Sequence, residues 1–134
     1  LLSYNNFGSS LFPQAKKVSQ AVSYLHRMFP NLIADGPVQS DFALNNEMLG
    51  ERFPFSALHN RNVNTLIFPN LDAANITYKI IKELNNTLSI RPILMGLRQS
   101  AHILQLGASV DEIVNMAAIA SIDAQEKLKL KARK

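Results

Sequence analysis

The chain contains no cysteine among its 134 residues. This absence excludes a disulfide scaffold, a metal site built from thiolates and a cysteine nucleophile. The glycine-rich nicotinamide fingerprint, the Walker loop, the His-Glu-x-x-His zinc motif and the Gly-x-Ser-x-Gly nucleophile motif are also missing. His26, His59 and His102 are far apart in the sequence and lack the spacing of metal ligands. The common sequence signatures of catalysis are therefore absent.

Long apolar runs are missing as well. No stretch of about 18 apolar residues and no signal-peptide pattern occurs in the chain. From this we expect a cytoplasmic protein with no membrane partner. The first residue is Leu1 rather than Met, and the segment that follows it already resembles a strand. We therefore expect the chain to be a piece of a longer polypeptide.

A basic surface for nucleic acid is missing too, although the formal net charge is +4. Residues 126–134 hold five of the 14 basic residues and one of the ten acidic residues, which leaves nine of each in the other 125 residues. The excess charge therefore belongs to one tail, which we interpret as a solvated helix end. A domain-wide footprint for nucleic acid is excluded, and no nucleic-acid partner is expected.

The chain does contain an alternation of strand-like and helix-like segments. Short apolar runs predict strands, and apolar residues recurring every three or four positions predict helices. Residues 50–64 have no clear period and are predicted to form a loop. This order predicts an α/β fold, a sandwich of three α/β/α layers with a largely parallel sheet and helices on both faces. The predicted strands are 1–7, 32–34, 65–68 and 92–95, and the predicted helices are 13–29, 40–49, 71–84 and 110–129.

The last predicted helix opens with a capping box, in which Ser109 caps the helix and Glu112 reaches back. Through Ala124 this helix is apolar on nearly all sides, a pattern typical of a helix buried between other elements. We therefore predict that residues 109–134 pack against a missing domain or a second subunit. Residues 1–108 are predicted to form the α/β domain itself.

Candidate ligand residues lie in loops that follow the predicted strands, because open α/β sheets bind ligands beyond the carboxyl ends of their strands. Asn70 and Asp72 begin a helix after Pro69, where free N–H groups suit an anion, although capping alone also explains them. Arg98 and His102 are candidates for holding a phosphate, or else a surface arginine and a satisfied histidine. Asp35 and Asp41 form a possible carboxylate pair, or else a turn former and a helix-start residue.

Four segments carry a family resemblance along nearly the whole chain: 35–43, 67–79, 92–96 and 113–119. In order and spacing they resemble the C-terminal half of the phosphate acetyl/butyryltransferase family. Segments 2–9, 71–75 and 120–125 are more similar to the phosphotransacetylase-like C-terminal region of long bacterial NADP-dependent malic enzymes. The resemblance implies part of a two-domain fold like that of isopropylmalate dehydrogenase. It also implies an N-terminal part that oxidatively decarboxylates malate, and a C-terminal part that senses acetyl-CoA.

Departures from the family pattern argue against catalysis in this chain. The family's Ser-Arg pair aligns with Gln105 and Leu106, and the Asp that serves as base for the coenzyme A thiol aligns with Glu112. Another family arginine aligns with Glu83, and Pro37 stands where Glu is usual. A leucine cannot stabilise a charged transition state. The resemblance therefore predicts a binding module whose scaffold is kept and whose arginines are lost.

The predicted function is regulatory: a non-catalytic module that senses acetyl-CoA and forms a homo-oligomer. An active phosphate acetyltransferase is the alternative, and a scaffold that binds no ligand is a third possibility. No cofactor is expected in this chain, and NADP and a divalent metal are expected only in the missing N-terminal part. The predicted ligand-binding residues are Asn70, Asp72, Asn75, Gly96, Arg98, His102, Gln105 and Glu112; no catalytic and no metal-binding residue is predicted.

Overall fold

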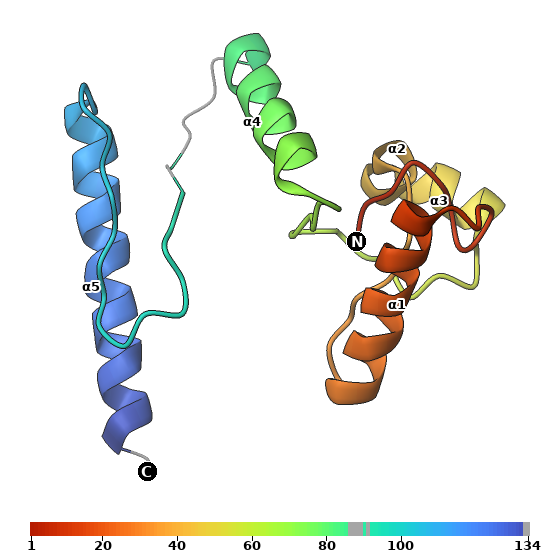
Figure 1. Cartoon of the computed structure of the whole chain (residues 1–134), viewed down its shortest axis with the longest axis horizontal. Coiled ribbons are helices and arrows are strands. Elements are labelled where there is room, and N and C mark those ends of the chain that lie inside the picture. Colours follow the sequence, from red (N-terminus) through yellow and green to blue (C-terminus); the bar gives the residue numbers. More distant parts are fainter. Residues whose placement is uncertain (86–89, 91, 133–134) are drawn as a thin grey trace. The chain divides into compact units, whose positions relative to one another are not determined.

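The structure is a computed structural model that describes residues 1–85, 90 and 92–132. Figure 1 shows its helices along the chain. Contacts divide the chain into two compact units, Leu1–Ile80 and Ile81–Lys134. The sequence predicts a domain boundary between residues 108 and 109. The division into contact units does not test that boundary, which stays a prediction. The helices are α1 (Pro13–Met28), α2 (Ser40–Leu44), α3 (Asn46–Arg52), α4 (Leu71–Asn85) and α5 (Val110–Ala132).

Helix α1 confirms the helix predicted from apolar spacing at residues 13–29. Its proline occupies the start of the helix, where a missing N–H costs nothing. The buried residues Ala15, Val18 and Val22 lie three and four positions apart, so they form one stripe. His26 and Arg27 lie in the last turn, where positive charge complements the helix dipole.

The helix predicted over residues 40–49 is present as two helices, α2 and α3. The break lies at Asn45, whose side-chain Oδ1 accepts a hydrogen bond from the N–H of Met48 at 3.0 Å. An asparagine at this position caps the second helix and so ends the first one. Helix α3 continues to Arg52, three residues into the stretch from residue 50 that was predicted to be loop.

The core of the first unit forms where two predicted strands, 1–7 and 65–68, meet the segment around Val38, which follows the strand predicted at 32–34. Leu2 and Val38 form a parallel β-bridge, and the N–H of Leu2 donates to the carbonyl of Ile67 at 2.7 Å. Leu2, Val38, Ala43 and Leu49 form the buried cluster. Segments from three parts of the sequence therefore meet at Leu2, and one of the two contacts is parallel. Packed against this cluster are Phe7, Phe42, Phe53, Leu58, Leu66 and Phe68.

The predicted sheet itself is not formed among the residues that the structure describes, where the only β-contact is that single bridge. A strand needs a neighbour to receive its backbone hydrogen bonds. Residues 32–34 are not paired in this way, and the carbonyl of Ala34 contacts His26 Nε2 at 2.7 Å. Residues 92–95 are exposed rather than buried. The described chain is therefore mostly helical, and the three layers stay unconfirmed.

Helices α4 and α5 confirm the two remaining predicted helices. Met116 is buried on α5, whereas Ile113, Val114 and Ile122 are 46, 60 and 62% exposed. The expected covering of this helix by another domain or subunit stays a prediction. Arg133 and Lys134 of the basic tail lie outside the described residues. Within the described ranges, no helix has both the length and the apolar character needed to cross a membrane.

Candidate functional site

The predicted ligand residues of the first unit lie at the start of α4. Asn70 Oδ1 accepts a hydrogen bond from the N–H of Ala73 at 2.8 Å, which confirms the predicted cap. Asp72 lies in the first turn, where its charge suits the helix dipole, and it is exposed, as is Asn75. The three side chains therefore gather at one helix start, with the amide of Asn70 already committed to the backbone.

A second group of polar residues lies at the start of α5, in the second unit. The N–H of Ser109 donates to Glu112 Oε2 at 2.9 Å, and the N–H of Glu112 donates to Ser109 Oγ at 3.2 Å. This reciprocal pair confirms the predicted capping box. The other carboxylate oxygen, Glu112 Oε1, lies 3.9 Å from Lys82 Nζ. Glu112 thus joins the capping box to a lysine near the end of α4.

The turn before α5 contains the other residues that align with the family's Ser-Arg pair. The carbonyl of Gln105 accepts a hydrogen bond from the N–H of Ala108 at 3.2 Å, and Gly107 has a positive φ of 81°. This φ favours glycine because a side chain would strain the backbone there. The side chain of Leu106 is fully exposed, at 104% of its reference area. An apolar group therefore faces solvent at the position where the resemblance leads one to expect an arginine.

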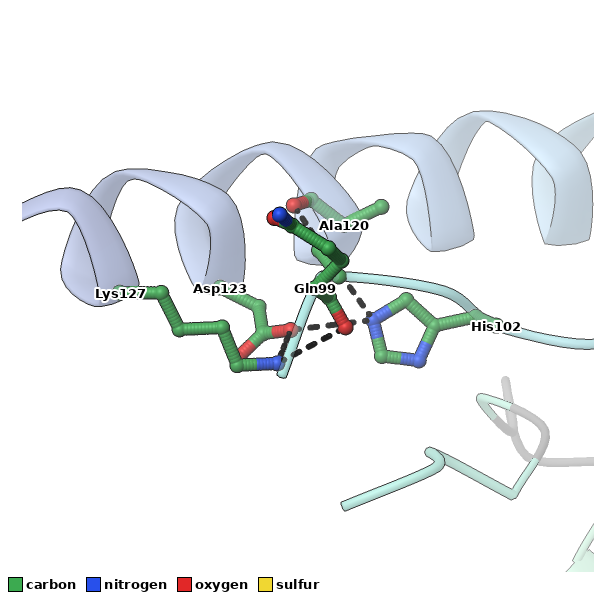
Figure 2. Close-up of polar contacts among 6 residues, drawn as sticks. Gln99, His102, Ala120, Asp123 and Lys127 are labelled. Atoms are coloured by element: carbon green, nitrogen blue, oxygen red, sulfur yellow. Dashed lines mark hydrogen bonds and ion pairs between the residues drawn. The ribbon is translucent and has the colours of Figure 1, made fainter. Parts of the chain in front are cut away.

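The third group is centred on His102, whose side chain is only 2% exposed (Figure 2). His102 Nε2 lies 3.8 Å from Asp123 Oδ2 on α5 and 3.5 Å from Ser100 Oγ. Lys127, also on α5, donates to Asp123 Oδ2 at 2.6 Å and to the carbonyl of Gln99 at 3.4 Å. The carbonyl oxygen of Gln99, the hydroxyl oxygen of Ser100 and the imidazole of His102 thus contact one face of α5.

A serine, a histidine and an aspartate side by side invite comparison with a catalytic triad, but the geometry differs. In a triad, the aspartate and the serine contact opposite nitrogens of the imidazole. Here Asp123 and Ser100 both approach Nε2, and the hydroxyl of Ser100 donates to the carbonyl of Ala120 at 2.9 Å. The serine oxygen is therefore not activated, and the arrangement serves as a fastening.

The carboxylate of Asp123 is stabilised in its charged form. The hydrogen bond from Lys127 is the largest cause that lowers the pKa of Asp123 below its ordinary value of 3.8. An opposite charge and a donated hydrogen bond both favour the ionised carboxylate. Asp123 therefore stays negative near neutral pH and holds Lys127 in place.

The structure separates some residues that the sequence analysis grouped. His102 is buried against α5, whereas Arg98 and Gly96, in the segment before it, are exposed. The predicted pairing of Arg98 with His102 around a phosphate stays a prediction. Sequence reasoning missed Lys82, Ser100, Asp123 and Lys127 as site residues. Only the spacing of Asp123 and Lys127, four residues apart on a helix, gave a signal in advance.

A cavity of about 810 Å³ lies in the first unit. Leu25, Val38 and Leu66 are among its apolar lining residues, and Arg61 and Asp35 are among its polar ones. Its volume lies within the range of small-molecule sites. None of the predicted ligand residues lines it. Among the described residues, no three His, Asp or Glu side chains are grouped so that they could hold a metal ion.

Comparisons connect the chain with known proteins. The family model described as phosphate acetyl/butaryl transferase matches residues 1–121. Over 126 residues the chain is 40% identical to an NADP-dependent malic enzyme of Haemophilus influenzae and 38% identical to one of Escherichia coli. These matches cover 94% and 93% of this chain but 16% of each relative. A phosphate acetyltransferase of Buchnera aphidicola subsp. Acyrthosiphon pisum is 36% identical over 125 residues, which cover 93% of this chain and 18% of that protein. The chain thus spans less than one fifth of the length of these relatives.

Proposed function

Since the chain belongs to the phosphate acetyl/butaryl transferase family, we propose that it is a non-catalytic, regulatory module of a malic enzyme, which binds acetyl-CoA as its effector. In this proposal the chain contributes to a three-layer α/β/α sandwich within a two-domain fold. Malate oxidation, NADP and a divalent metal belong to another part of the protein. The module also holds the subunits of a homo-oligomer together.

The state of Glu112 is the observation that carries the proposal. The resemblance aligns this residue with the base that takes the proton of the coenzyme A thiol. Here one carboxylate oxygen accepts the N–H of Ser109, and the other lies 3.9 Å from Lys82. A general base must have a free lone pair within reach of the proton it takes. Because Glu112 takes part in the capping box and lies close to Lys82, its carboxylate already makes structural contacts that compete with a role as general base.

The missing guanidinium supports the same conclusion. Transfer of an acetyl group between phosphate and a thiol develops negative charge, which preorganised positive groups must stabilise. At the aligned position this chain has Leu106, whose side chain is fully exposed and carries no charge. An effector needs only to be bound, so the loss of this arginine removes turnover and leaves room for recognition.

The proposed effector carries phosphates, and the second unit offers cations and N–H groups to meet them. Arg98 is exposed, and Lys82 lies beside the start of α5. Guanidinium groups bind phosphate through paired hydrogen bonds, and helix starts attract anions. We therefore assign Arg98 as the principal effector contact. Gly96, Gln105 and Glu112, in the same unit, are the further proposed contacts, whereas Asn70, Asp72 and Asn75 stay predicted ligand residues of the first unit.

Two assays on the protein that carries this chain test the proposal. The first follows formation of acetyl-CoA from acetyl phosphate and coenzyme A, and the expected rate equals that of the buffer control. The second measures malate oxidation while acetyl-CoA is added, and the expected result is a change in rate that saturates. Robust acetyl transfer would instead establish the alternative, an active phosphate acetyltransferase, which the 36% identical relative of that name favours.

Calorimetric titration with acetyl-CoA separates a sensor from a scaffold. Replacing Arg98→Ala should weaken binding about tenfold, since one phosphate contact is worth roughly 1.5 kcal/mol or more. Arg52→Ala is the matched control, because Arg52 is an exposed arginine in the last turn of α3 in the first unit. No heat of binding in the unmodified protein would leave only the scaffold role. Equal weakening by both replacements would remove Arg98 from the effector site.

A further inference from the structure

Residues 97–106 form a strap along α5, bounded by two glycines with left-handed backbones. Gly96 has a φ of +83° and Gly107 a φ of +81°, and a Cβ atom added at either position would meet nothing within 4 Å. Backbone conformation rather than lack of space therefore requires glycine at both ends. In Figure 1 the strap runs alongside α5 before the turn that begins this helix.

Polar contacts fasten the strap to α5. Ile103 and Leu106 are 66 and 104% exposed, and Leu97 and Leu104 are 42 and 40% exposed, so none of these four apolar residues of the strap is fully buried. The polar contacts concentrate in residues 99–102, which meet Ala120, Asp123 and Lys127 in the middle of the helix (Figure 2). A segment fastened at one place and bounded by glycines can detach without disturbing a hydrophobic core.

The histidine at the centre of this fastening has one satisfied and one unsatisfied nitrogen. The hydroxyl hydrogen of Ser100 goes to the carbonyl of Ala120, so its oxygen accepts a hydrogen from His102 Nε2 at 3.5 Å, whereas the carboxylate of Asp123 lies 3.8 Å from that nitrogen, beyond hydrogen-bond range. This network assigns the hydrogen of the imidazole to Nε2. Nδ1 is then an acceptor, and it is buried without a hydrogen-bond partner. Detachment would return Nδ1 to water, so its desolvation offsets part of what the fastening gains.

We propose that residues 97–106 are a latched strap with two states, and that His102 with Asp123 is the latch. In the latched state the imidazole is buried on α5. In the released state the strap turns about Gly96 and Gly107 and exposes His102. Regulation needs an element with two states that a ligand can bias. The strap carries Arg98 and Gln105, so the coupling of this latch to acetyl-CoA rests on the proposed function.

The latch is tested by hydrogen–deuterium exchange, followed by mass spectrometry, on the protein that carries this chain. The variant Asp123→Ala removes the carboxylate that faces His102. Glu126→Ala is the matched control: it removes a carboxylate from the same helix that is paired with Lys129 at 2.7 Å rather than with the strap. Alanine favours helix at both positions, so neither replacement weakens α5 by propensity.

The expected result is that amides of residues 99–104 exchange about threefold faster in Asp123→Ala, since a partly exposed polar contact at 3.8 Å is worth less than about 1 kcal/mol, and are unchanged in Glu126→Ala. Amides of α1 report on folding and should match the unmodified protein in both variants. Equal exchange of the strap in the two variants would overturn the latch. Acceleration spread evenly over all of α5 would also overturn it, because Asp123 would then stabilise the helix rather than the strap.

A second arm adds acetyl-CoA to the unmodified protein. A change in strap exchange on addition supports the coupling between effector and latch. If Asp123→Ala releases the strap but acetyl-CoA binds nowhere by calorimetry, the latch stands and the proposed function fails. If acetyl-CoA binds but the strap exchanges alike in Asp123→Ala and Glu126→Ala, the proposed function stands and the latch fails.

Discussion

Replacing Ser109→Ala should loosen the first turn of α5 and leave the rest of the helix in place. The serine oxygen accepts the N–H of Glu112 at 3.2 Å, and the reciprocal bond from the N–H of Ser109 reaches Glu112 Oε2 at 2.9 Å. The first N–H groups of a helix have no partner within the helix, so each capping bond satisfies a group that would otherwise depend on water. Alanine removes the first of these bonds and keeps the backbone N–H that makes the second.

The magnitude follows from measured capping energies. Loss of a serine cap costs about 1 kcal/mol, within a range of roughly 0.5–2 kcal/mol, which corresponds to about fivefold faster exchange of the first-turn amides. The variant Glu112→Gln should cost less, because an amide oxygen can still accept from Ser109. It removes the charge that faces Lys82 at 3.9 Å, a partly exposed pair that is worth less than about 1 kcal/mol.

Hydrogen exchange of residues 110–116 measures this effect locally. Ser121→Ala is the matched control, since Ser121 also lies on α5 but its hydroxyl accepts a hydrogen bond from Gln125 Nε2 at 3.3 Å, away from the first turn. The reasoning is refuted if Ser109→Ala and Ser121→Ala change exchange in the first turn of α5 equally. A cap role for Glu112 would likewise fail if Glu112→Gln loosened the first turn more than Ser109→Ala.

Two further predictions concern the core and the pH dependence of the latch. Leu49→Ala should lower the free energy of unfolding by about 2–5 kcal/mol because Leu49 is 1% exposed, whereas Leu44→Ala, at a 66% exposed position, should change it by less than about 0.5 kcal/mol in urea titrations. Equal effects would place Leu49 outside the core. The hydrogen bond from Lys127 lowers the pKa of Asp123 in the folded state. The stability that this carboxylate contributes is therefore present above its ordinary pKa of 3.8, and it is lost only as the pH falls through the lower pKa of the folded state. Protection of the strap amides, corrected for intrinsic exchange, should therefore persist down to pH 3.8. In Lys127→Met this protection should be lost at a higher pH. If the variant and the unmodified protein lose it at the same pH, Lys127 is not the cause of the lowered pKa.

The helices could be predicted because their signals are local. The spacing of Ala15, Val18 and Val22 marks the buried face of α1, and Ser109 with Glu112 marks the start of α5. Each signal lies within a few residues of the structure that it predicts. Asn45 is a local signal that the prediction did not use. An asparagine is a favourable N-cap and here caps α3, yet one continuous helix is predicted over residues 40–49.

The sheet could not be predicted with the same success because strands depend on partners far away in the sequence. Leu2 contacts Val38 and Ile67, so the predicted strands 1–7 and 65–68 meet, whereas the partner that forms the bridge, Val38, lies outside the predicted strands. Residues 92–95 have the same apolar composition but lie exposed in the described chain. An apolar run indicates that a segment will be buried, and the neighbour that buries it decides whether it becomes a strand.

The latch residues were missed for a related reason. Ser100, Asp123 and Lys127 come together only when residues 99–102 lie against α5, and no sequence spacing announces that contact. The sequence did identify His102, but as a phosphate ligand beside Arg98 or a satisfied histidine. In the structure its side chain is buried against α5 and its Nδ1 has no hydrogen-bond partner, so the second interpretation describes only its burial, and the first stays a prediction.

A regulatory module and an enzyme place opposite demands on the same cleft, and this contrast connects the two proposals. A catalyst must bind the transition state more tightly than the substrate, which requires fixed charge where Leu106 offers none. A sensor must instead bind its ligand more tightly in one of two states of the protein. In the proposed latch, the buried Nδ1 of His102 has no hydrogen-bond partner, and its desolvation reduces the free energy that separates the latched state from the released one. A ligand contact as modest as the one proposed for Arg98 would then be enough to shift the balance between the two states.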